Sequence, residues 1–204
     1  MTFTATTFYT NDYYLEQTKI LGVSCKKYEV PLIITKADDR GSWVKNCAYK
    51  AYYIYDMLMT LKTDVVWLDS DSQIVKYPEL FGSIKEDFAV RAEPGKKTKK
   101  PVGREQISLP DNWPTDIDPC WFNSGTIFFK NTDKTKELCR RWLQLCTKNE
   151  TDWDQWTLQQ AWCDIRPNTY WLPREYCQIK KLWGTNGAVI LHELASVAQK
   201  VNRT

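Results

Sequence analysis

The sequence predicts an α/β fold in which a mixed, mainly parallel central sheet is flanked by helices. Two observations carry this prediction: strand and helix patterns alternate through the N-terminal half, and the third expected strand, residues 65–68, is apolar throughout. A strand that is apolar on both faces is typical of a parallel sheet covered by helices on both sides. The 204 residues fit one domain, and the 43% of apolar residues are enough for a sizeable core.

The first half of the chain shows the alternation most clearly. Short runs of β-branched and aromatic residues predict strands, and longer stretches with apolar residues at helical spacing predict helices. This order indicates a doubly wound layer. The expected strands cover residues 3–8, 28–35 and 65–68, and the expected helices cover residues 13–25 and 45–61.

The second half has a different pattern. Residues 93–104 combine Pro and Gly breakers with a dense basic run, and we interpret them as a surface loop that is either a solvated linker or a functional lid. A helical pattern at 196–204 runs to the last residue, which leaves open that the chain is part of a longer protein. The remaining expected elements are strands at 88–91, 126–130, 170–172 and 188–191, and helices at 134–148 and 152–162.

Composition and charge argue against several classes of protein. A net charge of +3 is too small to indicate nucleic-acid binding by bulk electrostatics. Seven cysteines occur without a C-x-x-C pair, and their odd number argues against a zinc ribbon or a disulfide framework, so we expect reduced thiols. We find no signal-peptide pattern and no apolar run near the ~20 residues that span a bilayer, so we expect a soluble, cytoplasmic protein without a transmembrane segment.

Aromatic residues are unusually frequent, with 10 Trp, 11 Tyr and 7 Phe. Such a surplus is consistent with plain core packing, or with flat rings that stack on sugars or bases. Trp113 and Trp121 fall in expected loops, and Trp153 falls where a loop passes into the expected helix at 152–162. Both interpretations stay open for each of them.

The most informative motif is Asp69-Ser70-Asp71, which directly follows the apolar strand at 65–68. In parallel α/β sheets, ligands bind beyond the carboxyl ends of strands, and Asp69 stands at such an end. Two carboxylates this close repel one another unless a cation lies between them. Oxygen ligands suit Mg²⁺ or Mn²⁺, which in turn bind diphosphate oxygens. The alternative is an Asp-rich turn that caps a helix.

His192 is the only histidine, and it follows the expected strand at 188–191. This gives it a strand-end position comparable to that of Asp69. An imidazole as a third ligand would favour Mn²⁺ over Mg²⁺. With a single histidine, a zinc-hydrolase site that needs several is hard to build.

Four segments together resemble the GT-A glycosyltransferases. They are, in family order, Asp64-Val65-Val66-Trp67-Leu68-Asp69-Ser70-Asp71 with the helical Lys50 before it, Asn123-Ser124-Gly125-Thr126-Ile127, Asp154-Gln155, and Leu191-His192. The resemblance covers roughly residues 1–195 and implies a GT-A fold, with a Rossmann-like nucleotide-sugar-binding half at about 1–92 and an acceptor and catalytic half at about 105–204. One departure concerns the phosphates. Glycogenin-like members carry a Gly and Lys-Pro-Trp after the His, whereas Glu193-Leu194-Ala195 follow here, so Lys45, Lys50 or the basic loop would have to substitute.

The resemblance implies a role for each motif. Asp69, Asp71 and His192 would hold a Mn²⁺ ion, with Mg²⁺ as the alternative. Tyr9 would stack on the base, and Lys50 would contact phosphate or sugar. The residues expected to bind the nucleotide-sugar are Thr6, Thr7, Tyr9, Asp38, Arg40, Lys50, Asp69, Ser70, Asp71, Asn123, Ser124 and Gly125.

Catalysis is expected from Asp154, Gln155 and Asp152. If the reaction inverts the anomeric centre, Asp154 or Asp152 would accept the proton of the acceptor hydroxyl. If it retains the configuration, Asp154 or Gln155 would stabilise an oxocarbenium-like state. Both aspartates also suit a helix N-terminus, so a purely structural role is the alternative.

The function expected from these motifs is metal-dependent transfer of a hexose-type sugar from a UDP-sugar to a hydroxyl of a glycan or another acceptor. A sugar nucleotidyltransferase is the enzymatic alternative, but residues 6–11 lack the Gly-rich triphosphate loop that it would carry after the first strand. A carbohydrate- or nucleotide-binding module without activity is the other alternative. Such a module has no need of paired aspartates and a strand-end histidine.

Overall fold

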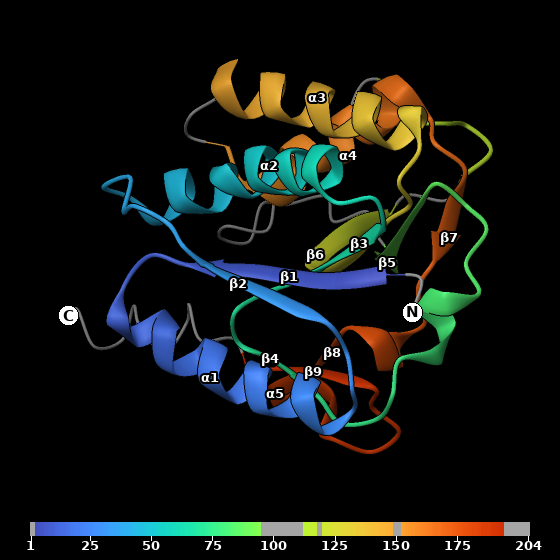
Figure 1. The fold of residues 1–204 in the computed structure, drawn as a ribbon. Coiled ribbons are helices and arrows are strands. Elements are labelled where there is room, and N and C mark those ends of the chain that lie inside the picture. The colour runs from blue at the N-terminus through green and yellow to red at the C-terminus, as the bar shows by residue number, and fades with distance from the viewer. Residues whose placement is uncertain (1–2, 95–111, 118–119, 149–151, 194–204) are drawn as a thin grey trace.

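A computed structural model describes residues 3–94, 112–117, 120–148 and 152–193 of the protein. A six-stranded sheet with the order β2-β1-β3-β6-β5-β7 forms its centre, and helices lie on both faces (Figure 1). Three of the five strand pairs are parallel and two are antiparallel. The predicted α/β fold with a mixed, mainly parallel sheet is therefore confirmed.

The parallel part of the sheet is built from the first half of the chain. Its elements are β1 (Phe3–Tyr9), α1 (Asp12–Lys27), β2 (Leu32–Lys36), α2 (Trp43–Thr60) and β3 (Asp64–Leu68). β2 begins four residues later than the sequence predicts. Tyr28 caps the C-terminus of α1, and Glu29 adopts a left-handed conformation with a φ of 54°, so this stretch forms a turn before the strand starts.

The rest of the sheet comes from β5 (Phe88–Pro94), β6 (Cys120–Phe129) and β7 (Thr169–Trp171). β6 runs antiparallel to both β3 and β5. It begins six residues before the predicted strand at 126, so residues 123–125 lie inside the strand instead of leading into it. The first half of β6 pairs with the end of β5 past an irregularity between Val90 and Arg91, and local sequence patterns do not reveal such pairing.

A second, three-stranded sheet contains β4 (Ser72–Ile74), β9 (Ile190–His192) and β8 (Gln178–Ile179), in the order β4-β9-β8. The sequence predicts a strand at 188–191 with His192 beyond its end. In the structure His192 is the last residue of β9, and this strand does not belong to the central sheet. β4 and β8 are too short to give a periodic signal. Three short helices lie between or near these strands in the sequence: η1 (Glu79–Gly82), η3 (Arg174–Tyr176) and α5 (Lys180–Trp183).

Two layers cover the central sheet (Figure 1). The helices α2, α3 (Asp133–Lys148) and α4 (Asp154–Ile165) lie on one face, and α1 lies on the other together with the second sheet. Val65 and Trp67 of β3 pack in the core on the helical face, whereas Val66 and Leu68 pack in the core on the opposite face. Burial on both faces explains why this strand is apolar throughout.

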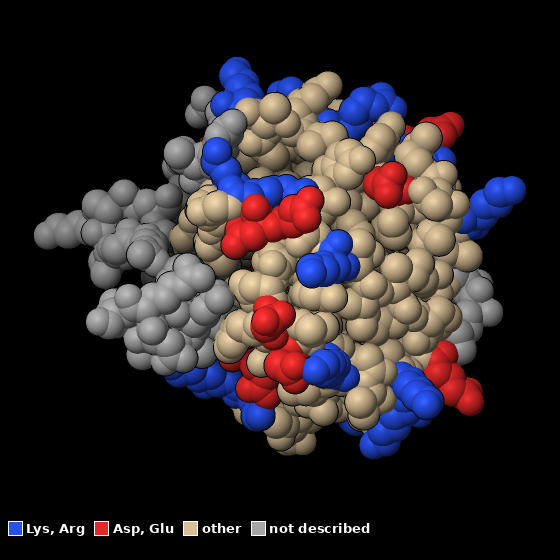
Figure 2. Space-filling view, turned by 60° about the vertical axis from the view of Figure 1, so that its left-hand side comes forward, with Lys and Arg blue, Asp and Glu red and all other residues tan. Residues whose placement is uncertain are grey.

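Several other features can be compared with the expectations from sequence. All seven cysteines are free thiols. No helix among the described residues is both long and apolar enough to cross a bilayer. On the face shown in Figure 2, the described basic and acidic side chains are interspersed and form no large patch of one sign. Most of the basic segment, residues 95–104, and the C-terminal residues 196–204 lie outside the described residues.

Candidate functional site

A cleft of about 350 Å³ opens at the carboxyl ends of β1 and β3. Because β6 runs antiparallel to β3, the first half of β6 reaches the same edge of the sheet. Every predicted motif therefore contributes to one cavity. The predicted site residues that line it are Tyr9, Lys50, Asp69, Ser70, Asp71, Asn123, Ser124, Gly125, Asp154, Gln155 and His192.

The structure does not bring five of the predicted residues to this cleft. Thr6 and Thr7 lie inside β1 and are fully buried, because the strand continues to Tyr9. The other three, Asp38, Arg40 and Asp152, are not among the lining residues; Arg40 instead lies over the ring of Tyr49, 3.4 Å from its centroid.

The carboxylate of Asp69 is held through one of its two oxygens. Its Oδ1 accepts a hydrogen bond of 2.8 Å from the indole Nε1 of Trp67 and lies 3.0 Å from the Lys50 ammonium. The backbone N–H of Asp69 also donates to the carbonyl of Gly125 at 2.8 Å. These contacts fix the orientation of the carboxylate, and among the described residues its Oδ2 remains available to a ligand.

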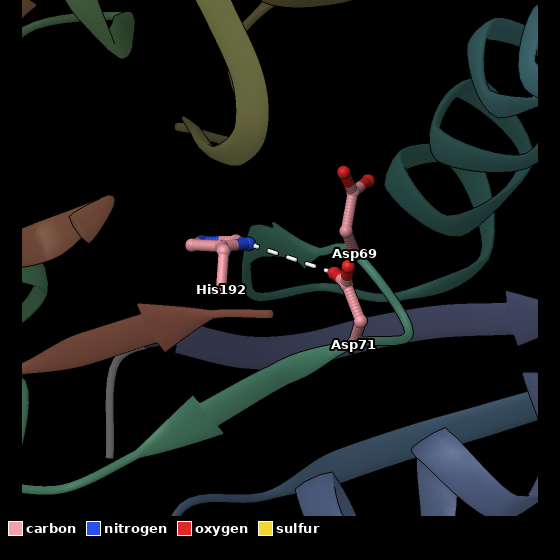
Figure 3. Close-up of side chains that lie close together, drawn as sticks. All are labelled: Asp69, Asp71 and His192. Carbon is pink, nitrogen blue, oxygen red and sulfur yellow. Dashed lines mark ion pairs between the residues drawn. The ribbon is translucent and has the colours of Figure 1, made fainter. Parts of the chain in front are cut away.

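Asp71 and His192 meet because β4 and β9 are paired. Ser72 lies opposite His192 in this antiparallel pair, so Asp71 and the imidazole approach one another, with 3.8 Å between Asp71 Oδ1 and His192 Nδ1 (Figure 3). Ligand atoms of Asp69, Asp71 and His192 all lie within 4.8 Å of one another. Two carboxylates and one imidazole are a donor set that suits Mn²⁺ or Mg²⁺, so these residues fit a divalent cation.

The imidazole of His192 is buried and hydrogen-bonded. Its Nε2 lies 2.9 Å from Thr126 Oγ1, and its Nδ1 lies 3.2 Å from Ser72 Oγ. Burial disfavours the charged imidazolium, but the neighbouring Cys177 and Asp71 favour it and raise the pKa of His192 to about 10. A metal ligand must be a neutral imidazole, so binding of a cation here would release a proton.

Lys50 connects this group of acidic residues to the catalytic candidates. Lys50 is 5% exposed, and its ammonium lies 2.9 Å from Asp154 Oδ2 as well as 3.0 Å from Asp69 Oδ1. Burial alone would lower the pKa of Lys50, but the Asp154 and Asp69 carboxylates outweigh it and raise the pKa above its usual value. Ser124 donates its hydroxyl to Asp154 Oδ2 at 3.1 Å, and its N–H lies 3.4 Å from Gln155 Oε1.

Gly125 is required by the close approach of His192. A Cβ at position 125 would lie 2.9 Å from His192 Cε1 and 3.0 Å from Nδ1. Because both the ring and the strand are buried, we expect Gly125→Ala to displace the imidazole and to cost about 1–3 kcal/mol of stability. Urea unfolding measures this cost. Gly22→Ala, in helix α1, is the control. Its Cβ would meet only Ile34 Cδ1, at an ordinary contact distance of 3.7 Å. Equal, small effects of both changes would contradict the prediction.

Sequence reasoning missed several polar residues that line the cleft, and the clearest case is Tyr14. Tyr14 lines the cavity, and its hydroxyl is buried without a hydrogen-bond partner among the described residues. Burial raises the pKa of Tyr14, and the proximity of Cys47, Asp71 and Asp69 adds to this effect. The signal was present in the sequence: Asn11 caps α1 by accepting the Tyr14 N–H at 3.1 Å, which places Tyr14 in the first turn after β1.

The three tryptophans singled out in the sequence have different surroundings in the structure. Trp113 packs against the core and donates its Nε1–H to the carbonyl of Ile117 at 2.9 Å. Trp121 lies in β6, away from the lining of the cleft. Trp153 lines the cleft, next to Asp154.

Comparison with known proteins defines the class of protein. Residues 55–192, more than half of the chain, match the family model described as nucleotide-diphospho-sugar transferase. The chain belongs to this family.

A solved structure shares the fold of this chain. The chain is similar to the crystal structure of a glycosyltransferase involved in the glycosylation of the major capsid of PBCV-1, a chlorella virus, with a TM-score of 0.68 and 13% identity over 100% of this chain and 98% of that chain. At this identity the likeness shows the fold alone, and together with the family it confirms the predicted GT-A-type glycosyltransferase. The sequence motifs also predict a likeness to the amino-terminal domain of a chlorella-virus glycosyltransferase, and the fold match agrees with this prediction. Comparison with curated protein sequences gives no significant match.

Proposed function

We propose that the protein transfers a hexose-type sugar from a UDP-sugar to a hydroxyl of a glycan or another acceptor, in a reaction that depends on Mn²⁺. One observation carries the proposal. Ligand atoms of Asp69, Asp71 and His192 lie within 4.8 Å of one another, although His192 is far from the two aspartates in the sequence. They share one cleft with Lys50 and Asp154.

The donor would be held along the edge of the sheet. The cation would be held by Asp71, His192 and the available Oδ2 of Asp69. When bound, it neutralises charge on a departing diphosphate. Tyr9 and Tyr14 line the part of the cleft that follows β1. The buried Tyr14 hydroxyl, which has no partner among the described residues, would donate a hydrogen bond to the nucleoside or its phosphates. Asn123 and Gly125, inside β6, would line the sugar end.

Asp154 and Gln155 are the groups that would act at the anomeric carbon. Lys50 and Ser124 hold the Asp154 carboxylate in place, whereas Asp152 does not line the cleft. Asp154 is therefore the better candidate, either as the base in an inverting reaction or, with Gln155, as a stabiliser of the oxocarbenium-like state in a retaining one.

Thermal unfolding with and without ligands tests the function. We expect UDP with Mn²⁺ at about 100 times its Kd to stabilise the fold by ~2.7 kcal/mol, which raises the Tm by roughly 5–10 °C. UDP without a divalent cation should give a much smaller shift, and GDP and CDP serve as comparators. The absence of any metal-dependent shift with UDP would contradict the proposal. A donor screen that measures UDP release, followed by NMR of the product, then identifies the sugar and the stereochemistry.

A further inference from the structure

Two tryptophans stand at the rim of the cleft. Trp43 is the first residue of α2, and Trp153 is the N-cap of α4. Both line the cleft, and their rings meet edge to face, with centroids 5.9 Å apart and planes at 87°. Trp153 is nevertheless 36% exposed. Residues far apart in the sequence thus combine to hold one exposed indole at the mouth of the site.

The backbone of Trp153 is fixed relative to the catalytic candidates. The carbonyl of Trp153 accepts hydrogen bonds from the N–H groups of Trp156 and Thr157, at 3.0 and 3.1 Å. The next residue, Asp154, is buried and paired with Lys50. An apolar ring that is exposed yet rigid binds a flat ligand at low cost in conformational entropy.

In the proposed arrangement, Trp153 stands beside the catalytic candidates. The nucleoside end of the donor would lie by Tyr9 and Tyr14 after β1, and the diphosphate would lie by the Asp69, Asp71 and His192 group. Trp153 instead adjoins Asp154 and Gln155, which would act at the anomeric carbon. A ring stacked on Trp153 would lie beside the reacting carbon, which is where an acceptor hydroxyl must enter.

We propose that Trp153, supported by Trp43, binds a pyranose ring of the acceptor by stacking, so that the acceptor is a carbohydrate. This inference rests on the proposed function and goes beyond it by naming the acceptor class. The flat, apolar face of a pyranose lies on the indole, and the ring's hydroxyls remain free to face Asp154 and Gln155. The hydroxyl of a serine or threonine side chain, or of an acyl-chain alcohol, offers no such rigid, flat face.

Saturation-transfer NMR tests the proposal, with the methyl glycosides of common hexoses as probes, in the presence of UDP and Mg²⁺, since Mn²⁺ is paramagnetic. We expect saturation of the ring C–H protons in the wild type and a loss of about tenfold in Trp153→Leu. Trp153→Phe, which retains an aromatic face, should keep most of the signal. Trp153→Met, whose longer and more flexible side chain adapts better to the space of the indole, replaces Trp153→Leu if that variant unfolds.

Trp171→Leu is the matched control. Trp171 is 38% exposed and packs against Phe122 and Trp162, outside the lining of the cleft. The Trp171→Leu variant should bind the methyl glycosides as the wild type does. The thermal shift with UDP and a divalent cation should be the same in the wild type and in every variant.

Each other outcome is informative. Unchanged sugar signals in Trp153→Leu, or no sugar signal in a wild type that binds UDP, would overturn the proposal. A parallel loss of UDP binding in Trp153→Leu would place the indole in the donor pocket and would also overturn it. A wild type that gives no metal-dependent shift with UDP would reject the proposed function itself.

Discussion

Replacement of Asp71 by asparagine is expected to abolish the stabilisation that UDP gives in the presence of Mn²⁺, and to lower the rate of sugar transfer at least ~100-fold. Asparagine keeps the shape of the side chain but removes one of the two carboxylates that would hold the cation beside His192. Thermal unfolding at a series of Mn²⁺ concentrations measures the binding, and release of UDP from a UDP-sugar measures the rate.

Two further variants complete this experiment: a control for the loss of one negative charge, and a change of a second residue that would bind the cation. Asp56→Asn makes the same change on the exposed side of α2, outside the cleft, and should behave like the wild type. His192→Gln should lose Mn²⁺-dependent UDP binding as Asp71→Asn does. If His192→Gln binds UDP and Mn²⁺ normally, His192 is not a ligand; if Asp71→Asn does so as well, the cation is bound elsewhere.

Replacement of Lys50 by methionine is expected to destabilise the fold by about 3–5 kcal/mol and to abolish transfer. Methionine has nearly the length of lysine but leaves the buried Asp154 carboxylate, and Asp69 beside it, without their cation. Urea unfolding measures the loss of stability as a shift of the midpoint at constant m-value. Lys45→Met, an exposed position on the same helix, is the control and should cost little.

A double-mutant cycle shows whether the pair itself is responsible. Asp154→Asn removes the charge that Lys50 neutralises, so Lys50→Met combined with Asp154→Asn should be less destabilised than the sum of the two single variants, by roughly 0.5–3 kcal/mol. Strict additivity would mean that the 2.9 Å contact contributes no coupling.

The sign of the pH dependence follows from the raised pKa of Lys50. A cation that is stabilised in the folded state contributes fully below its unfolded pKa, about 10.4 for lysine, and this contribution is lost as the pH rises beyond it. The difference in stability between the wild type and Lys50→Met should therefore stay constant between about pH 6 and 9. A difference that disappears within that range would contradict the assignment of the charge.

The sequence predicts much of the parallel half of the fold, because the signals there are local. Each residue of the stretch from Val65 to Leu68 is apolar since the strand is covered on both faces, and the alternation of strands and helices restricts the possible topologies. The two aspartates that follow mark the functional edge of the sheet, and the family order of the four motifs indicates the class of enzyme.

Other features could not be read from local patterns. His192 reaches Asp71 because β9 pairs with β4 across 120 residues of sequence, and both strands are too short to be periodic. Lys50 becomes the buried partner of two carboxylates only when α2, β3 and α4 pack together. Local sequence patterns left core packing and stacking on a ligand open for both Trp113 and Trp153, yet one packs in the core and the other lines the cleft.

The sequence by itself thus determined the type of sheet, the paired aspartates at its edge and the class of transferase. Only the tertiary structure decided which distant side chains share the cleft: His192 with Asp71, Lys50 with Asp154, and Trp43 with Trp153. The physical reason is that hydrophobic periodicity specifies which face of an element is buried, whereas the partner of that face depends on long-range pairing and packing, which no local pattern encodes.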